Sequence, residues 1–288
     1  PCVAVVAAGK LFLVDAGTNG LRNLGRMGYQ VGGISGVFLT HFHSDHIDGL
    51  GEVGTIRWAA GNQSAPLNIY GPEGVANVVE GFNMVYGQDV VYRNDHHGDK
   101  VTPLSGAGMI AVSAPLPAEG ELITVYDQDG LVVEMLAADH FPVTPAVAYR
   151  FSYKGRTALI SGDTNKSANI EKFAQGIDLL VHEALSPAML KAMNQAATAV
   201  GLPNTAKVFN DVLDYHASPT EAAETARDAE VGHLLYYHVV PPLILPGSEA
   251  LWLEGVDDRF SDYTLGEDGT SVMLPANSTD ILVTNDGL

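Results

Sequence analysis

The sequence has a single cysteine and no long apolar run. Cys2 is the only cysteine, which excludes an internal disulfide and a cysteine-rich metal cluster. No apolar run is long enough to cross a bilayer, so we expect no membrane partner. Residues 1–9 lack the charged start and apolar core of a signal peptide, and there is no initiator Met. The compartment stays open between the cytoplasm and export after removal of a signal peptide.

Basic residues are also scarce. Lys and Arg number 15 against 34 Asp and Glu, which gives a formal net charge of −19 at pH 7. Such a charge repels phosphate backbones at long range, and no Lys/Arg cluster supplies a local basic groove. We therefore expect a small-molecule partner and no nucleic acid.

The chain is long enough to bury a large core. It has 288 residues, of which 46% are hydrophobic. Strand-like and helix-like segments alternate, and neither repeats nor a linker interrupts them. The sequence predicts one α/β domain spanning residues 1–288.

The most informative segment is residues 39–50, Leu-Thr-His-Phe-His-Ser-Asp-His-Ile-Asp-Gly-Leu. It places His41, His43, Asp45 and His46 directly after a short apolar run typical of a buried strand. Imidazole nitrogens and carboxylate oxygens suit zinc, and the spacing is too tight for all four to reach one ion. The alternative is a polar surface loop, but H-x-H-x-D-H after a strand is a rare coincidence. Two ions are the natural interpretation.

This loop resembles the signature of the metallo-β-lactamase superfamily. The resemblance implies a four-layer αβ/βα sandwich with a dinuclear metal site at the ends of its strands. It also implies that Asp15, at the end of an early strand, orients the metal loop.

Three later residues complete the ligand set that the resemblance implies. Each follows a strand-like run: His140, Asp163 within Ser-Gly-Asp-Thr, and His238. A carboxylate has two oxygens, so Asp163 could bridge two cations. The implied assignment is His41, His43 and His140 on one ion, Asp45, His46 and His238 on the other, and Asp163 between them. Two divalent ions are expected, most simply Zn²⁺, with Mn²⁺ or Fe²⁺ also compatible.

Two further segments narrow the resemblance. Residues 182–185, His-Glu-Ala-Leu, and 216–218, His-Ala-Ser, are similar to the His-Glu-Ala-Thr and His-Ser-Thr motifs of tRNase Z-type hydrolases, with altered ends. In that family this glutamate and histidine move a proton to the leaving group. The predicted catalytic residues are therefore Asp45, Glu183 and His216, with Glu183 holding His216 as a general acid.

The substrate prediction depends on whether the chain has room for a tRNA-binding arm. A tRNase Z usually inserts its tRNA-gripping arm between the third histidine and the bridging aspartate, and here His140 and Asp163 are too close for one. We therefore expect a hydrolase of small sulfate or phosphate esters, of arylsulfatase or phosphodiesterase type and promiscuous between the two, with hydroxide between the ions as nucleophile. The alternatives are a tRNase Z-like ribonuclease with a partner-supplied arm, a lactonase, and a binding module without activity. A homodimer is expected by analogy.

Three segments remain outside these motifs. Residues 95–99, Asp-His-His-Gly-Asp, are expected to form a loop at the pocket edge. Residues 186–210 are helix-like and suit a lid, a dimer contact or core packing. The aromatic residues of the tail, Trp252, Phe260 and Tyr263, are expected over the pocket rim.

Overall fold

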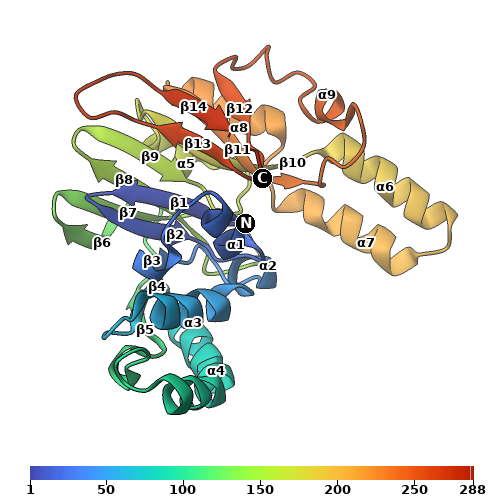
Figure 1. Cartoon of the computed structure of the whole chain (residues 1–288). Coiled ribbons are helices and arrows are strands. Elements are labelled where there is room, and N and C mark those ends of the chain that lie inside the picture. Colours follow the sequence, from blue (N-terminus) through green and yellow to red (C-terminus); the bar gives the residue numbers. More distant parts are fainter. Residues whose placement is uncertain (286) are drawn as a thin grey trace.

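A computed structural model describes residues 1–285 and 287–288. Its first sheet has five strands (Figure 1). In spatial order they are β1 (Val3–Ala7), β2 (Lys10–Val14), β3 (Ile34–Phe38), β4 (Leu67–Pro72) and β5 (Met109–Ala114). β1 pairs antiparallel with β2, and the remaining neighbours are parallel.

The second sheet has seven strands in the order β12-β11-β10-β9-β8-β7-β6. The neighbours from β6 to β9 are antiparallel and those from β9 to β12 are parallel. A separate hairpin pairs β13 (Thr270–Met273) with β14 (Leu282–Asn285). The bounds of the seven strands are β6 (Ile123–Gln128), β7 (Leu131–Ala137), β8 (Val147–Tyr153), β9 (Arg156–Ile160), β10 (Leu179–Leu185), β11 (His233–Val240) and β12 (Tyr263–Leu265).

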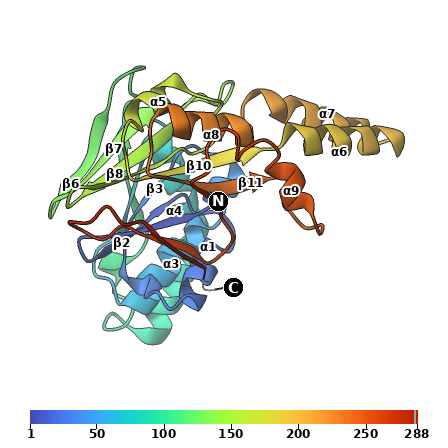
Figure 2. The same cartoon turned by 90° about the horizontal axis from the view of Figure 1, so that it is seen from above.

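The helices lie outside the two sheets or project from them (Figures 1 and 2). Short 3₁₀ turns occur at η1 (Val31–Gly33), η2 (Leu104–Gly106) and η3 (Val212–Asp214). The helices are α1 (Gly20–Arg26), α2 (Ser44–Ile47), α3 (Leu50–Gly61), α4 (Val75–His97), α5 (Ala168–Phe173), α6 (Pro187–Ala199), α7 (Pro203–Asp211), α8 (Pro219–Asp228) and α9 (Ser248–Trp252). No helix among the described residues combines the length and the apolar character that crossing a membrane requires.

Three apolar clusters define the layers. The first lies between the sheets, where Phe12 and Phe38 of one sheet meet Tyr149 of the other. The second packs α3 and α4 on the outer face of the first sheet, and the third packs α5 and α8 on the outer face of the second. The sequence of a strand that is buried on both faces is a continuous apolar run, as in residues 37–39. The predicted four-layer αβ/βα sandwich is confirmed.

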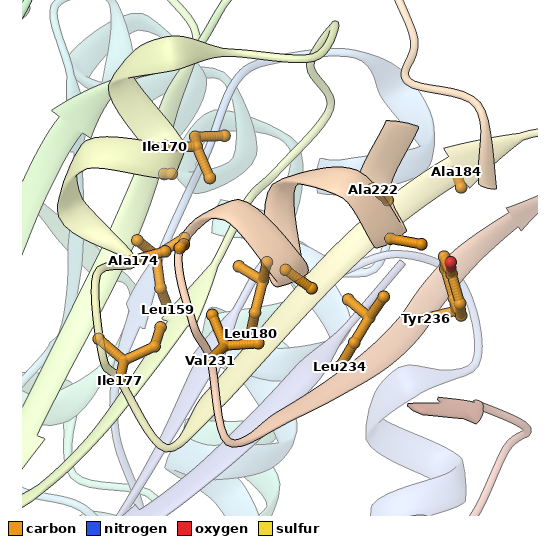
Figure 3. Packing of buried hydrophobic residues seen from close by; sticks show 14 of the residues in the cluster. Leu159, Ile170, Ala174, Ile177, Leu180, Ala184, Ala222, Val231, Leu234 and Tyr236 are labelled. Carbon is orange, nitrogen blue, oxygen red and sulfur yellow. The ribbon is translucent and has the colours of Figure 1, made fainter. Parts of the chain in front are cut away.

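Small residues allow α8 to lie close to the second sheet. Figure 3 shows Ala222 of α8 and Ile170 of α5 above Leu180 and Leu234 of the strands. Alanine on the inner face of a helix shortens the distance to the strands and keeps the contact free of voids. This packing fixes the start of α8, which follows His216 and Ser218 in the chain.

Trp252, Phe260 and Tyr263 of the tail lie in or against the core and not over a pocket rim, so that prediction is wrong. Trp252 is only 2% exposed. Its ring packs edge-on against Tyr236 at 5.0 Å between centroids, and Phe260 and Tyr263 pack against the same cluster. The reason is that the tail returns to the second sheet, where β12 pairs with β11, so its aromatic residues enter the core.

The helical segments are longer or more divided than the sequence predicted. Helix α4 continues to His97, so residues 95–97 form its exposed last turn and not a loop at the pocket edge. Residues 186–210 form two helices, α6 and α7, because the chain turns back at Gly201, where φ is +76°. The α6–α7 hairpin projects away from the sandwich (Figures 1 and 2).

Candidate metal centre

The metal loop follows β3 and is held from behind by Asp15. This residue directly follows β2 and has a positive φ of 60°, a conformation that aspartate tolerates better than most residues. The Thr40 amide donates to Asp15 Oδ1 at 2.8 Å, and the Thr40 hydroxyl donates to Oδ2 at 2.9 Å. His46 Nδ1 lies 2.7 Å from the same Oδ2. Asp15 therefore fixes both the start of the loop and the orientation of one imidazole, as the resemblance implied.

Four residues form a first group of candidate ligands: His41, His43, His140 and Asp163. Each offers one ligand atom, and these atoms all lie within 4.8 Å of one another. His41 Nε2 is 3.0 Å from His43 Nδ1 and 3.8 Å from Asp163 Oδ2. His140 Nε2 is 3.9 Å from the same Oδ2. Three imidazoles and one carboxylate oxygen therefore converge on a common point.

Asp45, His46 and His238 form a second group. Asp45 Oδ2 is 3.2 Å from His238 Nε2 and 3.6 Å from His46 Nε2. The other oxygen of Asp163, Oδ1, lies 3.2 Å from His46 Nε2 and 3.8 Å from His238 Nδ1. One oxygen of Asp163 thus faces each group, which is the arrangement of a carboxylate that bridges two cations.

Unpartnered buried atoms test whether cations fit between these groups. Among the described residues, four atoms of these two groups are buried without a hydrogen-bond partner: His46 Nε2, His140 Nε2, Asp163 Oδ1 and His238 Nδ1. A buried polar atom without a partner costs about 1–3 kcal/mol. A cation in each group would satisfy these atoms, so the donor set fits two divalent ions.

The protonation states agree with this role. Burial lowers the pKa of His41 to about 2, and burial also lowers the pKa of His140 to about 4. Both rings are therefore neutral at pH 7 and can donate a lone pair to a metal. Burial acts in the same direction on His46, but Asp15 and Asp163 outweigh it and raise its pKa to about 10. A cation beside Asp163 would take the place of that proton.

Gly162 determines where Asp163 points. Its φ is +62°, and a Cβ atom there would lie 2.8 Å from both the Thr40 Cβ and the Val147 carbonyl oxygen. Only glycine fits a backbone position that combines a positive φ with such close neighbours. The turn after β9 therefore packs directly under the metal loop and delivers Asp163 between the two groups.

Glu183 and His216 form a hydrogen-bonded pair beside the ligands. Glu183 Oε1 accepts from the Thr164 amide at 3.0 Å and lies 2.8 Å from His216 Nδ1. The His216 ring centroid is 5.2 Å from that of His140 and 6.1 Å from that of His238. Burial opposes the protonated imidazole, but the hydrogen bond to Glu183 and the charge of Glu183 outweigh it and raise the pKa of His216. Because Nδ1 is engaged by Glu183, Nε2 is the nitrogen available to a substrate.

Tyr215 belongs to the site, and the sequence did not indicate it. Its carbonyl oxygen lies 2.8 Å from His140 Nδ1, so it accepts a hydrogen bond that orients a candidate ligand. Its ring centroid is 4.6 Å from that of His140 and 4.8 Å from that of His216. The only available signal was its position directly before His216. His96 and His97 belong to neither ligand group, since they lie exposed at the end of α4.

Comparison with known proteins identifies the family. Residues 10–239 match the model of the beta-lactamase superfamily domain. Ribonuclease Z of Mycobacterium marinum is 34% identical over 257 residues, which is 88% of this chain and 84% of that relative. Ribonuclease Z of Mycobacterium bovis is 35% identical over 266 residues, 91% and 86% of the two chains. The crystal structure of the short form of human tRNase Z matches with a TM-score of 0.58 at 21% identity, over 83% and 85% of the two chains.

These relatives overturn two predictions made from the sequence. We expected small sulfate or phosphate esters and no nucleic acid, yet relatives that match most of the chain are named Ribonuclease Z. The net charge of −19 is a sum over the whole chain and does not describe the field at the metal loop. The missing arm between His140 and Asp163 excludes only one way of gripping RNA, and the α6–α7 hairpin projects from a different position.

The two sheets with helices on their outer faces fit the matched family. The likeness to human tRNase Z, at 21% identity, supports the fold, and the Mycobacterium relatives support the branch. The chain belongs to the metallo-β-lactamase superfamily of metal-dependent hydrolases, in its tRNase Z-like branch.

Proposed function

We propose that this protein is a metal-dependent endoribonuclease that processes the 3′ end of tRNA. The observation that carries the proposal is the buried Glu183–His216 pair, with 2.8 Å between Oε1 and Nδ1, beside a carboxylate that faces two ligand groups. Ribonuclease Z relatives at 34% and 35% identity support the choice of substrate. In the proposed reaction a phosphodiester is cleaved by water.

The ligand groups would hold two divalent cations. His41, His43 and His140 would hold one and Asp45, His46 and His238 the other, with Asp163 shared. Zinc suits these imidazole and carboxylate donors, and manganese or iron is also compatible with them. When bound, the cations would activate water for attack and neutralise charge on the phosphate oxygens.

His216 would protonate the departing ribose oxygen. A ribose alkoxide is a strong base and leaves readily only when it receives a proton as the P–O bond breaks. The raised pKa of His216 favours the protonated ring, in which Nε2 carries a proton. Glu183 accepts from Nδ1 and keeps the ring oriented while Nε2 donates. Asp45, which is partly exposed, would hold its cation at the open side of the site.

The charge at the loaded site differs in sign from the charge of the chain. Two divalent cations would bring four positive charges, and Asp15, Asp45 and Asp163 bring three negative ones. With neutral imidazole ligands, and with protonated His216 balancing Glu183, the sum is one positive charge, which attracts a phosphate at short range. The chain's net charge of −19 acts over longer distances, where salt screens it.

A precursor tRNA with a 3′ trailer tests the proposal. Metal-loaded protein should cut it once near the mature 3′ end, as read on a sequencing gel. Asp163→Ala should abolish cutting and lower the metal content, because each ligand group loses the oxygen that the shared carboxylate supplies to it. Asp127→Ala is the matched control, since Asp127 is an exposed aspartate on β6. Hydrolysis of an aryl phosphodiester without any cleavage of precursor tRNA would refute the proposal.

A further inference from the structure

The aromatic side chain nearest the proposed general acid is Tyr215. It lies at the base of the α6–α7 hairpin, after η3 and directly before His216. Its ring lies against both His140 and His216, with centroids 4.6 Å and 4.8 Å away. The ring of His43 is farther, at 6.5 Å. The side chain is only partly buried, so part of the ring remains open to a bound molecule.

The backbone of Tyr215 fixes where this ring stands. Its carbonyl oxygen accepts a hydrogen bond from His140 Nδ1 at 2.8 Å. The neighbouring Ala217 amide donates to the Thr164 carbonyl at 2.8 Å, and the Asn165 side chain donates to the Asp214 carbonyl at 3.0 Å. Because the chain is held on both sides of Tyr215, its backbone loses little conformational entropy when a planar group binds to the ring.

The position of Tyr215 also selects one side of the scissile bond. His216 must lie against the oxygen that departs, because it donates the proton there. Tyr215 adjoins His216 and His140 of the first ligand group, whereas the second group consists of Asp45, His46 and His238. The ring therefore lies on the leaving-group side of the phosphate.

We propose that the Tyr215 ring is the platform on which the base of the leaving-group nucleotide stacks. The inference rests on the proposed ribonuclease activity and names a specificity-determining residue for it. Every nucleobase has a π face, so such a platform tolerates sequence while it requires a base to be present. The site would thus distinguish a polynucleotide from a small ester by one stacked base next to the cut.

The test combines a base deletion with a ring deletion. Product ends are mapped first, which shows which nucleotide releases its oxygen. Precursor RNAs with an abasic nucleotide on either side of the cut are then compared in kcat/KM. For the unaltered protein, the RNA that lacks the base on the leaving-group side should have a kcat/KM lower by about 5- to 150-fold, which corresponds to the free energy of base–aromatic stacking. The abasic RNA on the other side should not show this loss.

The variants locate the effect. In Tyr215→Leu the abasic penalty should vanish, whereas Tyr215→Phe should retain it, because the ring and not the hydroxyl stacks. Tyr92→Leu is the matched control, since Tyr92 is 64% exposed on α4 outside the site. A second readout uses RNA with 2-aminopurine at the leaving-group position, because stacking quenches the fluorescence of this base. When protein and RNA are mixed rapidly, the fluorescence should fall before the RNA is cut. Tyr215→Leu should not show this fall.

The outcomes separate the two proposals. If precursor tRNA is not cut, the proposed function fails and this inference fails with it. If the RNA is cut but Tyr215→Leu keeps the full abasic penalty, the function stands and the stacking role is wrong. A penalty confined to the opposite side of the cut would also overturn the inference.

Discussion

Replacing Glu183 with Gln removes a charge at the proton-donating pair and leaves its shape nearly intact. Glu183 is fully buried, and its Oε1 accepts from both the Thr164 amide and His216 Nδ1. Because both bonds go to the same oxygen, the glutamine carbonyl can accept them in its place. A hydrogen bond to a charged group contributes about 1.5–3 kcal/mol. If that energy stabilises protonated His216 in the transition state, kcat on RNA should fall by about 10- to 150-fold.

The dependence on the leaving group distinguishes a proton donor from a structural contact. A nitrophenolate is a much weaker base than a ribose alkoxide and departs without a proton. Hydrolysis of bis(4-nitrophenyl) phosphate by Glu183→Gln should therefore stay close to the level of the unaltered protein. His216→Ala should show the same contrast more strongly, and adding Glu183→Gln to it should cost little more, because the two residues act as one unit.

Steady-state rates on both substrates with equal metal content provide the measurement. Thermal unfolding of each variant serves as the control for folding, since a buried carboxylate has been changed. An equal loss on RNA and on the nitrophenyl ester would mean that Glu183 supports the site structurally and does not tune proton donation. No loss on either substrate would refute the pair as a donor altogether.

Three further predictions follow from the geometry. Activity on RNA should fall as pH rises through the raised pKa of His216, since only its protonated form donates, and Glu183→Gln should move that fall to lower pH in a kcat profile. Asp15→Ala should weaken the cation of the second group by about 10- to 100-fold in metal titrations and the cation of the first group by less, because Asp15 contacts His46 directly and reaches His41 only through Thr40. Gly162→Ala should destabilise the fold by about 1–3 kcal/mol in chemical denaturation. Gly176→Ala, at a similar φ of +64° with open space around the Cβ position, should cost less, and equal costs would contradict the packing argument.

Local patterns pointed to the ligands of the metal loop, and the family resemblance supplied the other three. The apolar run at residues 37–39 ends β3, and the histidines and aspartate that follow it lie at the strand end in the structure. His140, Asp163 and His238 come from strands far apart in sequence, yet the fold brings them to the same edge. The spacing of these residues in the sequence does not predict that they meet. The resemblance to a family predicted it.

Other features depend on contacts that a linear pattern does not contain. Tyr215 has no periodicity or motif of its own, and its role follows from ring distances to His140 and His216. Trp252 looked like a rim residue because glycine and acidic residues surround it, but the tail returns to the second sheet and buries it. Summed charge failed for the same reason, since it averages over surfaces that never face the substrate.

The α6–α7 hairpin has a consequence for how such a chain can diverge. It leaves the sheet just after Glu183 and returns just before His216, so both members of the pair stand at its anchoring ends, 33 positions apart. Closing a longer loop costs only about 0.6 kcal/mol for each doubling of its length. The hairpin can therefore lengthen, shorten or change its surface while its two ends stay fixed. The surface of the hairpin and the proton-transferring pair can vary independently in a chain built this way.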